Sequence, residues 1–251
     1  MELPTQRLKA KTMDPRLLTI FGQSKVGKST MLSELPNCLI IDTEQGTDFL
    51  DGMIVQINSM YELRQLPQAI ANTNHQYDFG AIDTIDQVVS WVEKEIVLEY
   101  NQEQRNRGMN QKINDVSEIP YGAGFAMVRN KVMRVIAALK ASFPKLIIVG
   151  HRKKTIIGEN KVEFSSSSLD LTGKLRNLIC ADSDAIGYVF RDKQNELKMS
   201  FQTSDELEVG SRCDHLRGKV LNFEWNLIYP DTIGQPKKAE KMASSLNLPS
   251  Q

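Results

Sequence analysis

The segment Gly22–Thr30 constrains the fold of this chain more than any other feature. It reads Gly-Gln-Ser-Lys-Val-Gly-Lys-Ser-Thr and matches the phosphate-binding pattern G-x-x-x-x-G-K-[ST] in full. The apolar stretch Leu17–Phe21 enters it, and the helix-compatible segment Ser29–Leu35 leaves it. A strand, a loop and a helix in this order direct backbone N–H groups toward phosphate oxygens. The segment therefore predicts an α/β fold with a nucleoside-triphosphate site at the end of a strand.

The residue types in this loop each suit phosphate binding. Gly22 and Gly27 allow backbone conformations that a β-carbon would oppose. Lys28 is expected to bind the β- and γ-phosphates of ATP, and Ser29 to offer its hydroxyl to Mg²⁺. Thr30 completes the motif, although we expect it to start the helix more than to bind a ligand. The predicted nucleotide-binding residues are Gly22, Gln23, Ser24, Lys25, Val26, Gly27, Lys28, Ser29 and Thr30.

Short apolar runs alternate with helical patterns along the first 150 residues, which is typical of βαβ units and a mostly parallel sheet. The predicted strands are Leu17–Phe21, Cys38–Asp42, Met53–Ile57, Phe79–Asp83 and Lys145–Gly150. Apolar residues near a 3.6-residue period predict helices over Thr84–Tyr100 and Phe125–Leu139. The polar stretch Asn101–Pro120 between them is expected to be a helix tail followed by a mobile loop.

The pattern changes after Gly150. His151–Ile157 is expected to continue as extended chain, and Gly158–Asp170, with four consecutive serines, as a loop. A short helix follows over Gly173–Cys180, and Ala185–Phe190 and Leu197–Phe201 are predicted to form a β-hairpin. We therefore expect an N-terminal extension (1–15), one domain (16–234) and a polar C-terminal tail (235–251).

Carboxylates are also needed, because a phosphate loop alone neither holds a metal fully nor activates water. Asp83 ends the apolar run Phe79–Asp83, so a parallel sheet would deliver it to the edge that carries the phosphate loop. There we expect it to hold Mg²⁺ through water. The alternative is that Asp83 caps the next helix, a role that suits Asp86 better.

The run Leu39–Ile41 enters the sequence Asp42-Thr43-Glu44. A D-T-E after the strand that follows the phosphate-loop helix resembles the RecA-like recombinases. This resemblance implies that Glu44 activates the attacking water. The candidate catalytic residues are Glu44, Lys28 and His151.

Four further elements resemble one group among these proteins. They are Tyr121–Phe125, Leu146–His151, Leu171–Arg176 and Asp184–Tyr188. In this order they are similar to phage-type RecA-like P-loop ATPases of the single-strand-annealing and recombination group, the Sak-like proteins of the AAA class. The resemblance covers residues 16–220 and implies a single RecA-like P-loop NTPase domain that acts with ATP on single-stranded DNA in recombination or replication. It also implies a homo-oligomeric ring or filament, and a single-strand DNA-binding protein as a further partner.

The same resemblance implies roles for residues near the end of the core. His151 would sense whether the γ-phosphate is present and relay this to the loop that follows it. The alternative is that His151 is a strand-end histidine whose hydrogen bonds are satisfied within the core. A basic residue would act in trans on the site of a neighbouring subunit, and in hexameric relatives this residue belongs to a K-x-R pattern near the end of the core. Arg212 lies at the corresponding position, but the lysine of the pattern is missing. Lys198 and Arg217 are alternative candidates.

DNA contacts are expected on the two segments Asn101–Pro120 and Lys153–Asp170. The predicted contacts are Lys153, Lys154, Lys161, Lys174 and Arg176, with Phe164 as the aromatic residue for base stacking. The alternative for these residues is a solvated basic face.

Charge and composition leave other functions open. The 31 basic residues balance 31 acidic residues, so a polyanion would have to be held by a local basic patch. The neutral net charge and the few aromatic residues favour an alternative function, a P-loop motor or a nucleotide-gated structural or packaging switch that does not itself bind DNA. The family elements favour action on single-stranded DNA. A small-molecule kinase would need a substrate lid and a basic clamp, and neither is visible.

The sequence also predicts a cytoplasmic protein, within a bacterial host if the chain is phage-encoded. The three cysteines lie far apart without C-x-x-C spacing, which suits a reducing compartment. No stretch approaches the roughly 20 apolar residues of a membrane span, and the N-terminus does not read as a signal peptide. No membrane partner is expected.

Overall fold

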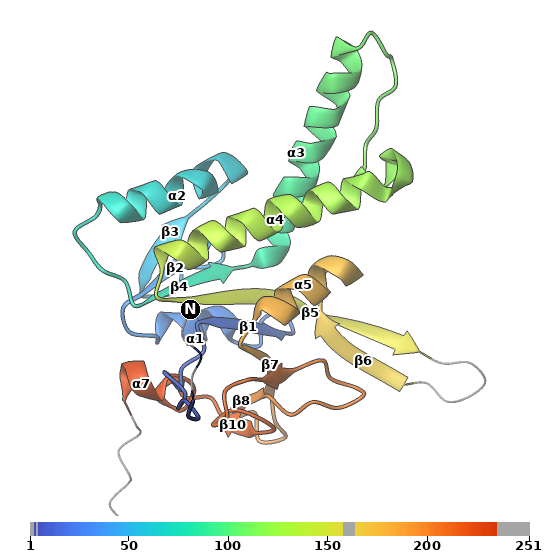
Figure 1. The fold of residues 1–251 in the computed structure, drawn as a ribbon. Coiled ribbons are helices and arrows are strands. Elements are labelled where there is room, and N and C mark those ends of the chain that lie inside the picture. The colour runs from blue at the N-terminus through green and yellow to red at the C-terminus, as the bar shows by residue number, and fades with distance from the viewer. Residues whose placement is uncertain (1–2, 4, 158–163, 235–251) are drawn as a thin grey trace, which may run out of the picture.

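The computed structural model describes residue 3 and residues 5–157 and 164–234 (Figure 1). Its central sheet has the strand order β10-β8-β7-β1-β5-β4-β2-β3, with β6 paired to β5 and β9 to β7. The strands are β1 (Leu17–Gly22), β2 (Cys38–Asp42), β3 (Met53–Gln56), β4 (Phe79–Asp83), β5 (Lys145–Ile157), β6 (Phe164–Leu169), β7 (Ala185–Arg191), β8 (Leu197–Ser200), β9 (Gly210–Ser211) and β10 (Val220–Asn222). The strands from β7 to β3 along this order are mutually parallel. The predicted mixed α/β fold with a mostly parallel sheet is confirmed.

Helices cover both faces of the sheet. They are α1 (Lys28–Ser33), α2 (Met60–Asn72), α3 (Ile85–Asn106), α4 (Ala123–Ser142), α5 (Gly173–Asp182), α6 (Trp225–Ile228) and α7 (Pro230–Ile233), with 3₁₀ turns at Val116–Glu118 and Pro120–Gly122. Figure 1 shows α2, α4 and α5 on one side and α1 and α7 on the other. Alternate residues of β1 divide between two cores: Leu17 packs with the α2–α5 side, and Leu18 packs with α1 and α6.

The predicted strands match the observed ones to within two residues, and β5 continues beyond Gly150 to Ile157, where extended chain was expected. The reason is that β1, β2, β4 and the first part of β5 are buried on both faces, so that their sequences read as continuous apolar runs. The hairpin predicted after the core is also present, because β7 and β8 pair antiparallel across the turn at residues 192–196.

The helix α2 is absent from the predicted elements. Its start carries a capping signal that was readable in the sequence: Ser59 accepts a hydrogen bond from the N–H of Glu62, and the Glu62 carboxylate accepts one from the N–H of Asn58. The predicted helix Thr84–Tyr100 is α3, which continues to Asn106 and therefore includes the expected helix tail.

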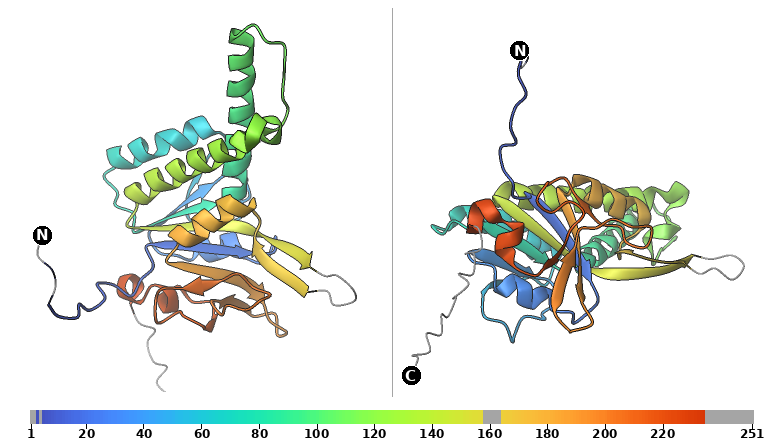
Figure 2. Two further views of the ribbon diagram at one scale, coloured as in Figure 1. Left: turned by 45° about the vertical axis from the view of Figure 1, so that its right-hand side comes forward. Right: turned by 90° about the horizontal axis from the view of Figure 1, so that it is seen from below.

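The serine run was predicted as part of a loop, and this prediction is wrong. Residues Phe164–Leu169 form β6, which pairs antiparallel with β5. The other edge of β6 is also bonded, because the N–H of Ser167 donates to the carbonyl of Glu206 and its carbonyl accepts from the N–H of Glu208. Backbone pairing on both edges outweighs the turn preference of serine, and the partner on the second edge lies far from β6 in the sequence. Figure 2 shows the β5–β6 hairpin projecting from the body of the protein.

The segment that precedes β1 is tied to α7. The buried carboxylate of Asp14 accepts hydrogen bonds from the N–H groups of Asp231 and Thr232, each at 2.9 Å. In return, Asp231 accepts bonds from the hydroxyl of Thr12 and the N–H of Met13. Residues 12–14 and 231–232 therefore hold one another, while the domain boundaries given above stay a prediction.

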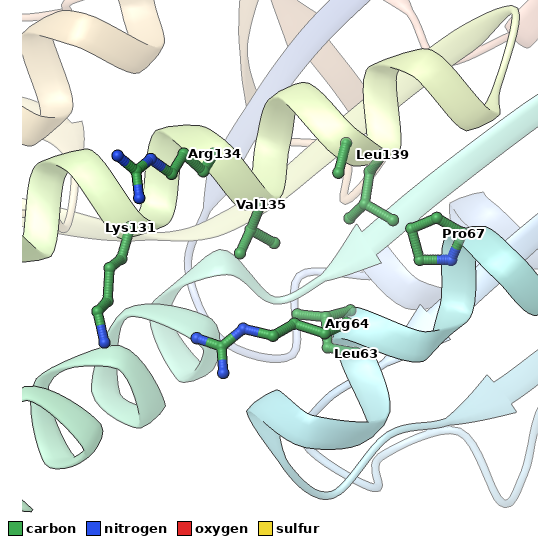
Figure 3. A pocket seen from close by; sticks show the side chains of 8 residues that line it. Leu63, Arg64, Pro67, Lys131, Arg134, Val135 and Leu139 are labelled. Carbon is green, nitrogen blue, oxygen red and sulfur yellow. The ribbon is translucent and has the colours of Figure 1, made fainter. Parts of the chain in front are cut away.

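A groove between α2 and α4 lies away from the phosphate loop. Figure 3 shows that its lining combines the cationic side chains of Arg64, Lys131 and Arg134 with apolar ones such as Leu63 and Leu139. Two of the cations are neutralised, because Arg64 binds Glu95 through both terminal nitrogens and Lys131 contacts Glu95 and Glu99.

No helix in the described parts of the chain combines the length and the apolar character that crossing a bilayer requires.

Candidate active site

The phosphate loop joins the end of β1 to the start of α1. Gly22 is the last residue of β1, and a β-carbon there would lie 2.6 Å from the carbonyl oxygen of Val189. Gly27 caps α1 with a φ of 116°, in a region that L side chains rarely adopt. Both glycines are therefore required by the local geometry, for two different reasons.

The backbone of the loop fits a phosphate group. Among the hydrogen bonds within the described residues, none is donated by the backbone N–H of Lys25, Gly27, Lys28 or Ser29. Unpaired N–H groups gathered at a helix start carry partial positive charge and need an acceptor. A triphosphate supplies such acceptors, so the donor set matches the ligand that the motif predicts.

The Lys28 side chain folds back over this loop. Its Nζ donates to the carbonyl oxygens of Gly22 at 3.3 Å and Gln23 at 2.9 Å, and only 6% of the residue is exposed. Burial lowers the pKa of Lys28, and nearby carboxylates, Asp83 first, oppose this shift. The ammonium group therefore lies inside the loop in a partly desolvated position, where an added phosphate charge would stabilise it.

Ser29 and Asp83 bring the loop and the end of β4 together. The Ser29 hydroxyl donates to the Asp83 carboxylate at 2.5 Å. Burial raises the pKa of Asp83, and the hydrogen bond from Ser29 opposes that shift. A hydroxyl and a carboxylate are hard oxygen ligands of the kind that Mg²⁺ prefers, so these two residues fit the predicted metal site.

Glu44 lies two residues beyond β2 and points to the same edge of the sheet. Its Oε1 accepts a 2.7 Å hydrogen bond from the hydroxyl of Thr84, the residue after Asp83. The carboxylate of Asp42, in contrast, stabilises the turn that follows β2, because it accepts hydrogen bonds from the backbone N–H groups of Glu44 and Gln45. Only Glu44 of the two acidic residues in this motif has a side chain turned toward the site.

His151 lies beside the start of the loop, since it is paired with Gly22 in the β1–β5 register. Its Nδ1 is 3.3 Å from the Asp86 carboxylate and 3.9 Å from that of Glu44, and its backbone N–H also donates to Asp86. Burial raises the pKa of Asp86, and His151 opposes this shift. Asp86, expected only as a structural residue of the helix start, is therefore also the nearest partner of His151.

The predicted DNA contacts are distributed over the β5–β6 hairpin and α5. Lys153 and Lys154 are exposed on β5, and Lys153 lies 3.6 Å from Asp170. Lys174 is exposed in the first turn of α5. Lys161 lies outside the described residues, as does the side chain of Phe164.

Arg176 differs from these lysines because its side chain is engaged. It donates to the hydroxyl of Ser168 at 3.0 Å, and its Nε lies 3.1 Å from the carboxylate of Glu208. These contacts hold α5 against β6 and the segment behind it.

The candidate trans-acting residue Arg212 lies near the start of β7, at the opposite end of the parallel strands from the phosphate loop. It follows β9, which pairs with the first residues of β7, and its side chain donates to the carbonyl of Ala181 and lies 3.7 Å from Asp184. The structure does not bring it to the site of its own chain. Its competitors are both paired: Lys198 with Asp192 and Glu196, and Arg217 with Asp214.

Two further residues, Thr84 beside the site and Tyr121 on the turn that precedes α4, were not assigned a role from the sequence. Thr84 could have been suspected, because it directly follows the carboxylate at the end of β4. Tyr121 is fully exposed and has a φ of 58°, which is costly for a residue with a side chain. Its position between Pro120 and Gly122 was the readable signal for an exposed turn.

Comparison with known proteins identifies the family of this chain. No curated protein matches the chain. A model of the AAA domain family matches residues 14–213, which is most of the chain and includes the phosphate loop, Glu44, Asp83 and His151. Together with the fold and the geometry of the loop, this match shows that the chain belongs to the AAA domain family of P-loop ATPases.

Proposed function

We propose that this protein binds and hydrolyses ATP with Mg²⁺ and uses this cycle to act on single-stranded DNA, in phage-type recombination or replication. The observation that carries the ATPase part is the meeting of three groups at one sheet edge. Lys28 lies within the loop, the Ser29–Asp83 pair lies beside it, and Glu44 is held next to them by Thr84.

The roles within the site follow from this arrangement. Mg²⁺ would neutralise phosphate charge, with Ser29 as its direct ligand and Asp83 bound through water. Glu44 would accept the proton of the attacking water, and its bond from Thr84 keeps one carboxylate oxygen oriented. The test is steady-state ATP hydrolysis with and without Mg²⁺; a protein that binds ATP but never turns it over would leave only a nucleotide-gated switch.

The link from nucleotide to DNA rests on the continuity of β5. His151 faces Glu44 and Asp86, and the same strand continues into the projecting hairpin that carries Lys153 and Lys154 (Figure 2). A change in hydrogen bonding at His151 is worth about 1 kcal/mol, which is enough to shift a two-state equilibrium several-fold. The exposed Tyr121, two residues before the start of α4, supplies a flat side chain on which a base could stack.

The test of the DNA part is filter binding of single-stranded DNA with and without ATP. Binding that ATP strengthens would support the proposal, and no binding at low salt would refute it. The same proposal includes a homo-oligomeric ring or filament, in which Arg212 of one subunit acts on the nucleotide site of its neighbour. It also includes a single-strand DNA-binding protein as a partner. Size-exclusion chromatography with ATP tests the oligomer.

One observation favours the second candidate, a P-loop motor or structural switch that does not bind DNA. Part of the basic surface is already neutralised, because Lys153 lies near Asp170 and Arg176 near Glu208. Paired cations attract phosphates less strongly than unpaired ones. ATP hydrolysis without any DNA affinity would favour this alternative.

A further inference from the structure

Arg191 touches the phosphate loop from the side opposite to the catalytic groups. It is the last residue of β7, which pairs with β1 so that Val189 stands beside Gly22. Because side chains alternate along a strand, Arg191 projects on the same face as Val189, which packs against Val26 in the core beside α1. A β-carbon on Gly27 would lie 3.4 Å from Nη2 of Arg191. The guanidinium group therefore lies against the loop itself.

The guanidinium group of Arg191 is not paired with a carboxylate of the described residues. Within the described residues it forms no ion pair, and its one hydrogen bond is donated by Nη1 to the carbonyl oxygen of Asn195 at 2.8 Å. The acidic residues of the same turn, Asp192 and Glu196, are occupied by Lys198. An exposed guanidinium without a counter-ion, placed against an anion-binding loop, is suited to bind a phosphate oxygen.

The position of β7 in the sheet determines which part of the nucleotide this residue can reach. The strand order places β7 on one side of β1, whereas β5, β4 and β2, which carry or precede His151, Asp83 and Glu44, lie on the other. The γ-phosphate must lie on the side of Asp83 and Glu44, where hydrolysis occurs. Arg191 therefore faces the end of the nucleotide that does not react.

We propose that Arg191 binds the α-phosphate of the nucleotide and thereby contributes to the affinity for ATP and ADP alike. This inference rests on the proposed function, because it requires that the loop holds a nucleotide. A contact to a group that does not react acts equally on the ground state and the transition state, so it changes binding and leaves turnover unchanged.

The test compares the full-length protein with Arg191→Gln in nucleotide titrations and in ATPase kinetics. Glutamine removes the charge but keeps an N–H donor for the carbonyl of Asn195. We expect affinity for ATP and for ADP to fall together by about tenfold, with KM raised equally and kcat unchanged. Arg191→Lys should recover part of the loss because it restores the charge.

The matched control is Lys193→Gln, an equal charge change on an exposed residue of the same turn. We expect it to bind both nucleotides like the unmodified protein. Unchanged affinity in Arg191→Gln would overturn the inference, as would a loss confined to ATP, a loss of kcat alone, or an equal loss in Lys193→Gln. Failure of the unmodified protein to bind any nucleotide would instead overturn the proposed function, and this inference with it.

Discussion

The hydroxyl of Ser29 donates a 2.5 Å hydrogen bond to the carboxylate of Asp83, which joins the phosphate loop to the end of β4. The two residues are 54 positions apart in the sequence and meet because β1 and β4 both pair with β5. The two side chains expected to hold Mg²⁺ are thus already in contact, and little rearrangement is needed to form the metal site.

The first prediction concerns this pair. Asp83→Asn keeps the shape of the side chain and an oxygen that can accept from Ser29, but it removes the charge. We expect the Mg²⁺ concentration for half-maximal ATPase activity to rise by about tenfold, because a metal site loses affinity when an anionic oxygen becomes neutral. A Mg²⁺ titration at fixed ATP measures this, with the exposed Asp51→Asn as control. An unchanged Mg²⁺ dependence would assign Asp83 to a purely structural role.

The second prediction concerns Lys28. Its ammonium group already lies within the loop, bonded to two carbonyl oxygens, so its removal deletes the charge at the phosphate position. Lys28→Ala should weaken ATP binding by at least tenfold, or roughly 1.4 kcal/mol. Calorimetric titration with ATP measures the loss, and circular dichroism checks the fold. Full affinity in a folded variant would contradict the assignment of the nucleotide site.

The third prediction separates catalysis from binding at Glu44. In Glu44→Gln the amide oxygen can still accept from Thr84, but the side chain can no longer take a proton. ATP affinity should stay unchanged while turnover falls at least ~10²-fold. Thr84→Val, which loses only the orienting hydrogen bond, should show a smaller loss of turnover. If Glu44→Gln hydrolyses ATP like the unmodified protein, the role inferred from the D-T-E resemblance is wrong.

The sequence predicted the elements whose causes are local, and it missed those that depend on tertiary pairing. β1, β2 and β4 follow from apolar runs, and the phosphate loop from its own residues. The second edge of β6 could not be predicted, because its partner segment lies some 40 residues further along the chain. The same holds for Arg191, whose contact with the loop depends on the pairing of β7 with β1. The start of α2 at Ser59 was readable and was overlooked.

A fourth prediction concerns stability at low pH. Hydrogen bonding by Arg64, with Lys131 adding to it, lowers the pKa of Glu95 from 4.5 to about 2. A carboxylate with a depressed folded-state pKa stabilises the fold fully above pH 4.5, and this contribution is lost as the pH falls toward 2. Glu95→Gln should therefore cost up to about 1 kcal/mol at pH 7, since the pair is partly exposed, and less at pH 3.

Urea unfolding at the two pH values measures this difference. The control is Glu103→Gln, which removes an exposed pair with Arg107 at the end of α3 and should change stability little at either pH. A cost for Glu95→Gln that is the same at pH 3 as at pH 7 would mean that packing, and not charge, accounts for its effect.

The last prediction tests DNA binding by the β5–β6 hairpin. Lys153 and Lys154 are exposed on β5, two and three residues beyond His151, so they follow any movement of that strand. Reversing both to Glu should abolish binding of single-stranded DNA and spare basal ATP hydrolysis, because neither side chain reaches the phosphate loop. In the control variant, Lys9 and Lys219, which are exposed elsewhere, are both replaced by Glu, so that the total charge changes by the same amount.

The salt dependence of binding gives a second measurement. In the unmodified protein, the affinity for single-stranded DNA should fall with salt concentration with a log–log slope of about −0.7 for each phosphate neutralised, and the slope should be smaller in single Lys153→Gln or Lys154→Gln variants. If both double variants lose DNA affinity equally, the attraction is a general charge effect. If neither loses affinity, DNA binds elsewhere or the protein is the switch described above, and the hairpin serves another partner.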